Sequence, residues 1–132
     1  MDGVDVIGAV VMAHLVGDYL LQTHWMAVEK TSRWSAAIAH GLTYTLPFLF
    51  ATQSPAALAV IAGTHIVIDR YRLARHVVWL KNQFAPRSAR PVWGKDVAGY
   101  PEGTPAWLAT WLLIIADNTL HLLINLGSVV WL

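Results

Sequence analysis

The chain has 132 residues, of which 56% are hydrophobic and 13% charged, and its mean hydropathy is +0.48. This composition argues against an ordinary soluble domain and indicates an integral membrane protein. It has no cysteine, which excludes disulfides, thiolate nucleophiles and cysteine metal ligands, so any metal must be bound by nitrogen and oxygen atoms. The net charge is only +1 and the basic residues border apolar segments, which argues against a soluble nucleic-acid-binding protein.

The first apolar segment runs from about residue 4 to 22, close to the roughly 20 residues that span a bilayer. Its start is acidic, with Asp2 and Asp5, and lacks the basic region of a cleaved signal peptide, so we expect the segment to remain in the mature chain. His14 and Asp18 lie four residues apart, which puts them on one face of a helix, and Gln22 continues that row.

The second apolar segment covers residues 34–51 and contains His40. A short polar link around residues 24–35 joins it to the first segment. A tight turn follows it, with Pro55 at a first helical position. Because both connections are short, we expect antiparallel neighbouring helices.

The third segment is predicted over residues 55–80. Within it, His65 and Asp69 repeat the four-residue spacing of histidine and aspartate. Its last residues alternate basic and apolar side chains, which indicates an amphipathic extension that lies at the membrane interface.

The fourth segment covers residues 107–131, after a loop over residues 81–106 that is rich in proline and glycine. Asp117 and His121 are again four residues apart on one helical face, and Asn118 lies beside them.

These segments predict an all-α fold, a single transmembrane four-helix domain over residues 1–132. All basic residues fall in or beside two polar stretches, and by the positive-inside rule both basic loops are cytoplasmic while the N-terminus and the C-terminus are outside. The basic residues are Lys30, Arg33, Arg70, Arg72, Arg75, Lys81, Arg87, Arg90 and Lys95.

Polar residues inside the apolar segments point to one shared site, because an ionisable side chain in hydrocarbon is costly unless it is paired or bound. His14 lies eight residues before Gln22 and His40 lies seven after Arg33, so at about 1.5 Å per residue their depths agree. We expect the candidates to meet in the inner half of the bundle. They are His14, Asp18, His40, His65, Asp69, Asp117 and His121.

Neutral imidazole and carboxylate are ligands of zinc and, with more carboxylate, of manganese or iron. A divalent metal is therefore the expected cofactor, with zinc favoured. Seven ligands exceed one tetrahedral ion, so there are either two ions or one ion with the remaining residues orienting its ligands. Gln22 and Asn118 are candidates for that orienting role. The competing interpretation is that His–Asp hydrogen bonds only hold the helices together.

The ordered set of residues 13–22, His40, residues 65–69 and residues 117–121 resembles the DUF3307 family, small bacterial and phage membrane proteins of unknown function. The likeness spans nearly the whole chain, and it implies a multi-pass protein of the bacterial inner membrane without implying an activity. Asn118 departs from the glutamine expected there. The chain is also distantly similar in architecture to the predicted membrane-bound metal-dependent hydrolases of the DUF457 type.

The leading hypothesis is a metal-dependent membrane hydrolase that acts on a phosphoester or lipid headgroup. In it Asp18, Asp69 and Asp117 bind metal together with the histidines, and one of these groups is the general base toward bound water. The alternatives are a divalent metal or proton transporter, a haem protein ligated through His40 and His65, and a non-catalytic phage membrane interaction protein. The expected partners are the lipid bilayer and the substrate, and a homodimer is compatible with so small a bundle.

Overall fold

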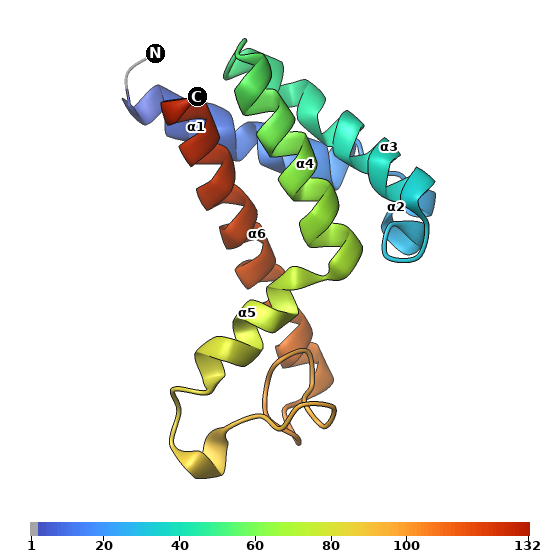
Figure 1. Ribbon diagram of the computed structural model, residues 1–132, viewed down its shortest axis with the longest axis vertical. Helices are drawn as coiled ribbons and strands as arrows, with labels where there is room; N and C mark the ends of the chain where they lie inside the picture. Colours follow the sequence, from blue (N-terminus) through green and yellow to red (C-terminus); the bar gives the residue numbers. More distant parts are fainter. Residues whose placement is uncertain (1–2) are drawn as a thin grey trace. The chain divides into compact units, whose positions relative to one another are not determined.

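The computed structural model describes residues 3–132, and this part of the chain is helical without a β-strand (Figure 1). The predicted all-α class is thereby confirmed. Asp2, part of the acidic start that the sequence places outside the cell, lies outside the described residues. The described residues form two compact units, residues 3–71 with 121–132, and residues 72–120.

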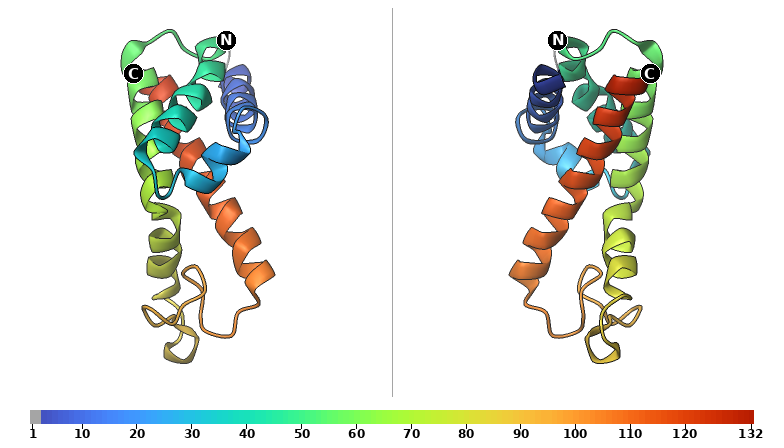
Figure 2. Two further views of the ribbon diagram at one scale, coloured as in Figure 1. Left: turned by 90° about the vertical axis from the view of Figure 1, so that its right-hand side faces the viewer. Right: turned by 90° about the vertical axis from the view of Figure 1, so that its left-hand side faces the viewer.

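The first unit is a group of helices around one apolar core. Its elements are α1 (Gly3–Leu15), the π-helical turn η1 (Val16–Leu20), α2 (His24–Glu29), α3 (Trp34–Thr45), the 3₁₀ turn η2 (Leu46–Phe50), α4 (Pro55–Tyr71) and the last part of α6 (Ala106–Trp131). Of these, α3 and α4 form an antiparallel hairpin, which Figure 2 shows from two sides. The buried side chains that form this core are Val10, Ala13, Tyr44, Phe48 and Ile61.

The first helix changes from α to π geometry before it ends. The Leu21 N–H donates to the Val16 carbonyl at 3.0 Å, a bond that spans five residues instead of four. Gly17 lies in this turn against α3, where a Cβ atom would come within 2.6 Å of the Tyr44 ring. A single π turn inside a helix is frequent at functional sites, and this one carries Asp18.

Prolines and a serine set the ends of the α3–α4 hairpin. Pro47 has no N–H to donate, and the helix tightens into 3₁₀ geometry at this point. Pro55 is the first residue of α4. The Ser54 hydroxyl accepts from the Ala57 N–H at 3.3 Å and donates to the Leu132 carbonyl at 2.9 Å. This last bond ties the end of α6 to the start of α4.

The second unit contains α5 (Leu73–Asn82), the short 3₁₀ turn η3 (Arg87–Ala89) and the first part of α6. Where the sequence predicts one segment over 55–80, the chain breaks at Arg72, which has a left-handed φ of 52°. A small core of Val78, Tyr100 and Ala109 holds this unit together.

The loop after α5 is organised around Asp96. Its carboxylate accepts the N–H groups of Gly94 at 3.1 Å and Gly99 at 2.8 Å, and it pairs with Arg75 at 3.5 Å. Burial opposes ionisation, but the backbone N–H donors of Gly99, Gly94 and Asp96 itself, together with the charge of Arg75, outweigh it and lower the pKa of the Asp96 carboxyl. Gly99 has a φ of 89° and lies so close to the Arg75 carbonyl that a side chain has no room.

One described helix is long and apolar enough to cross a membrane, namely α6. Only 17% of its most apolar 18-residue window is buried inside the protein. Large apolar side chains are also exposed on the first unit, among them Leu20 at 76% and Phe50 at 90%. Such surfaces are typical of sites that contact lipid or another protein.

Candidate metal centre

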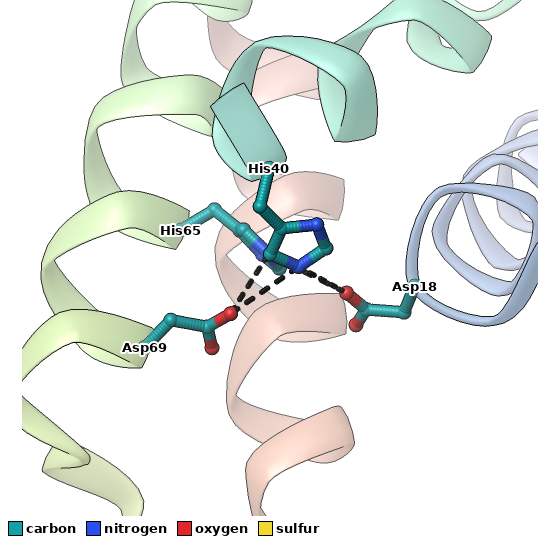
Figure 3. Close-up of side chains that lie close together, drawn as sticks. All are labelled: Asp18, His40, His65 and Asp69. Atoms are coloured by element: carbon teal, nitrogen blue, oxygen red, sulfur yellow. Dashed lines mark hydrogen bonds and ion pairs between the residues drawn. The ribbon is translucent and has the colours of Figure 1, made fainter. Parts of the chain in front are cut away.

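Four buried side chains from three elements of the first unit converge on one point (Figure 3). Asp18 comes from η1, His40 from α3, and His65 and Asp69 from successive turns of α4. The side chains of the two histidines are 1% exposed, that of Asp18 is 11% exposed and that of Asp69 is 6% exposed. All four belong to the set that the sequence predicts.

The atoms that face one another are one carboxylate oxygen from each aspartate and the Nε2 atom of each histidine. His40 Nε2 lies 3.1 Å from Asp18 Oδ1 and 3.3 Å from Asp69 Oδ2. His65 Nε2 lies 3.4 Å from the same Asp18 oxygen and 3.2 Å from the same Asp69 oxygen. The two Nε2 atoms are 2.9 Å apart.

These separations have the size of a tetrahedral zinc site. Zinc binds nitrogen and oxygen at about 2.0 to 2.1 Å, which puts the ligands of a tetrahedral ion about 3.3 Å apart. The five separations lie between 2.9 and 3.4 Å. The opposite ring nitrogens of His40 and His65, their Nδ1 atoms, are buried without a hydrogen-bond partner in the described part of the chain. Both imidazoles therefore make their polar contacts at the atom that would bind the ion.

The same geometry does not fit haem. Two axial nitrogens on one iron atom lie about 4 Å apart on opposite faces of a porphyrin. The Nε2 atoms of His40 and His65 are 2.9 Å apart and leave no space for a ring between them. The haem alternative is therefore disfavoured.

Two more histidines lie behind the carboxylates. His14, on α1, has its Nδ1 atom 3.6 Å from the second oxygen of Asp18. His121, on α6, has its Nε2 atom 3.3 Å from the second oxygen of Asp69. Both side chains are buried. Each therefore lies where it can hold a carboxylate in place while the other oxygen faces the centre.

A buried tyrosine and asparagine extend this outer layer. The Tyr44 hydroxyl lies 2.8 Å from His14 Nδ1 and accepts from the Asn125 side-chain amide at 2.6 Å. The Tyr44 ring stacks on the His65 ring with their centroids 3.6 Å apart. Neither residue is predicted from the sequence, although each lies four residues after a predicted one: Tyr44 after His40, and Asn125 after His121.

Lys30 reaches the cluster from the end of α2. Its Nζ atom lies 2.6 Å from Asp69 Oδ2, one of the four central atoms. Arg70 holds the link that follows α2 by donating to the carbonyls of Thr31 and Ser32. In the sequence Lys30 indicates only the membrane topology, because nothing in the local pattern pairs it with a residue 39 positions away.

The remaining predicted residues take other places. Asp117 and Asn118 are half-buried on the part of α6 that belongs to the second unit, and Asp117 lies one turn before His121 along that helix. Gln22 is half-buried, and its amide donates to the backbone carbonyl of Asp18 at 3.1 Å. It therefore fixes the main chain at Asp18.

Comparison with models of known protein families gives a match. The model of the DUF3307 family, described as a protein of unknown function, matches residues 6–88, which contain all four central residues. No curated protein and no solved structure is significantly similar to the chain. The similarity to DUF457-type hydrolases is not shown by these comparisons.

Proposed function

The chain belongs to the DUF3307 family, whose function is unknown, and we propose that it is a membrane protein that binds one divalent metal ion, preferably zinc, through Asp18, His40, His65 and Asp69. The observation that carries this proposal is the set of five donor separations between 2.9 and 3.4 Å, in a buried cluster. Two carboxylates and two neutral imidazoles balance the charge of a divalent ion.

The proposal reduces the seven predicted ligands to four. His14 and His121 become residues that orient the carboxylates, in agreement with their positions beside the outer oxygens. Asp117 has no part in the four-atom cluster. A structural His–Asp network, the competing interpretation, gives no reason for four donor atoms to share one centre.

Metal binding is favoured over hydrolysis. Four protein ligands fill a tetrahedral ion, as in structural zinc sites, whereas catalytic zinc keeps one position for water. A hydrolase would need one of the four to leave the ion, and Asp18 and Asp69 would be the candidates because a carboxylate could then become the general base.

We also propose that the protein crosses the bacterial inner membrane four times, with both basic loops in the cytoplasm. The apolar, weakly buried α6 supports this. Three further helical stretches, residues 3–20, 34–50 and 55–71, are nearly long enough to span a bilayer and expose large apolar side chains. Clustering of the basic residues at two links supports the orientation.

The test is the metal content of protein purified in detergent without added chelator. We expect one zinc per chain, and a thermal unfolding temperature that falls when a chelator removes it, because a ligand that binds only the folded state stabilises it by about 2.7 kcal/mol at 100 times its Kd. Asp18→Asn and His65→Gln should weaken zinc binding by more than about 100-fold, and His121→Gln by about 10- to 100-fold.

His24→Gln is the matched control, because His24 is an exposed histidine outside the cluster. It should leave zinc content and unfolding unchanged. Wild-type protein that neither contains a divalent metal nor is stabilised by adding one would contradict the proposal. That result would favour the alternative of a non-catalytic membrane interaction protein.

A further inference from the structure

Lys30 is more exposed than any of the four central residues of the metal centre. Its side chain is 20% exposed, while that of Asp18 is 11% exposed and those of His40, His65 and Asp69 are between 1% and 6% exposed. The ammonium lies 2.6 Å from Asp69 Oδ2, closer than the Nε2 atoms of His40 and His65, which lie 3.3 Å and 3.2 Å from the same oxygen. A cation that enters the site from this side therefore meets Lys30 first.

A divalent ion and this ammonium compete for the same oxygen. An ion bound to Asp69 Oδ2 would lie about 2.1 Å from it, and the ammonium is 2.6 Å from that oxygen. The two cations would then lie less than about 5 Å apart in a buried site, where repulsion between charges is strong. Binding of the ion therefore destabilises the ion pair between Lys30 and Asp69.

The formal charges of the site change sign when metal binds. Without metal, two carboxylates and one ammonium carry a net charge of −1 with neutral imidazoles. With a divalent ion the same groups carry +1. The excess positive charge then lies at the accessible edge, where the freed ammonium is the exposed group.

We propose that a divalent ion displaces Lys30 from Asp69 and that the released ammonium forms a binding site for a phosphate-type anion, which exists only in the metal-loaded protein. This rests on the proposed metal centre and gives that centre an anionic ligand. The anion is either free phosphate or the phosphate of a lipid headgroup.

The experiment measures how fast an amine-acylating reagent modifies each lysine, by mass spectrometry of the full-length protein in nanodiscs of phosphatidylcholine. The chain has three lysines, and the exposed Lys81 and Lys95 are internal references. Loading with stoichiometric zinc should raise modification of Lys30 relative to these two. If zinc binds but leaves Lys30 as protected as before, the displacement is wrong.

The anion is tested with the same readout on the zinc-loaded protein. Free phosphate binding predicts that inorganic phosphate protects Lys30 again in phosphatidylcholine, and headgroup binding predicts protection in phosphatidylglycerol nanodiscs without added phosphate. If neither inorganic phosphate nor phosphatidylglycerol protects Lys30, the proposed anion site is wrong. In the metal-free protein, neither inorganic phosphate nor phosphatidylglycerol should change the modification rate of Lys30.

Variants provide an independent measurement of the competition. Lys30→Gln should tighten zinc binding by about tenfold or more, because the competing charge is gone. Arg33→Gln removes an equal charge from the same link, but Arg33 is 67% exposed and pairs with Glu29, so zinc affinity should change less than about twofold. Unchanged or weaker zinc binding in Lys30→Gln contradicts the inference, whereas absence of zinc from the wild type contradicts the metal centre itself.

Discussion

At the scale of single residues, the centre has an inner layer of four donor atoms and an outer layer that fixes them. The outer layer contains His14 and His121 beside the carboxylates, and Tyr44 against His65. Outer residues of this kind commonly set how well a metal site is organised. The Tyr44 hydroxyl is the clearest member, since it contacts two buried polar side chains at once.

Removing that hydroxyl tests the outer layer. Tyr44→Phe keeps the ring on His65 but leaves Asn125 and His14 without this buried partner. We expect a loss of about 1 to 3 kcal/mol in the free energy of unfolding, measured by denaturant unfolding of metal-free protein in detergent. Tyr71→Phe is the control, because Tyr71 is 53% exposed and its ring contacts do not need the hydroxyl. Equal stability of the two variants would contradict a role for the Tyr44 hydroxyl.

Sequence reasoning found the residues of the centre by their spacing along single helices. His65 with Asp69 shares a helical face, and burial of charged residues in apolar segments marks them as a site. Spacing has no information about contacts between helices, so it did not separate the inner from the outer histidines. For the same reason it did not find Lys30, whose partner Asp69 lies on another element.

At the scale of elements, the site depends on how closely η1 approaches α3. Gly17 allows the approach, since a Cβ there would lie 2.6 Å from the Tyr44 ring and 2.9 Å from its carbonyl oxygen. The next residue is Asp18, so the position of this one turn fixes one of the four donors. Apolar periodicity predicts a helix here, but it does not distinguish an α turn from a π turn, which a five-residue hydrogen bond defines.

Gly17→Ala should therefore damage the centre from a position that carries no donor atom. The added methyl group must push η1 away from α3, which moves Asp18, and we expect zinc affinity to fall by at least about tenfold. Gly63→Ala is the control, because Gly63 lies in α4 with nothing within 4 Å of a new Cβ. It should leave affinity unchanged and stabilise the helix by about 0.5 to 1 kcal/mol. Equal zinc affinity in both variants would contradict the role assigned to the close approach.

At the scale of the whole molecule, hydropathy and charge predict both an all-α fold and four membrane crossings, and the helices of the structure establish the fold class. The all-α class follows from composition and from long apolar segments, and it is confirmed. The break at Arg72 was not predictable, because a left-handed residue other than glycine leaves no mark in a hydropathy pattern. The two compact units meet at this residue in the sequence, and the predicted four crossings remain to be tested.

The absence of cysteine makes that test direct, because single-cysteine variants have no background labelling. Gln53 lies in the exposed turn between η2 and α4, and Arg87 lies in the exposed loop after α5. With both basic loops cytoplasmic, a membrane-impermeant maleimide added to intact spheroplasts should label Gln53→Cys and should label Arg87→Cys only after the membrane is broken. Both variants should be labelled in detergent, which checks that each thiol is accessible. Labelling of Arg87→Cys in intact spheroplasts would overturn the orientation. Labelling of both positions from outside would also place them on the same side of the membrane, which contradicts the proposed single crossing by α4 between them.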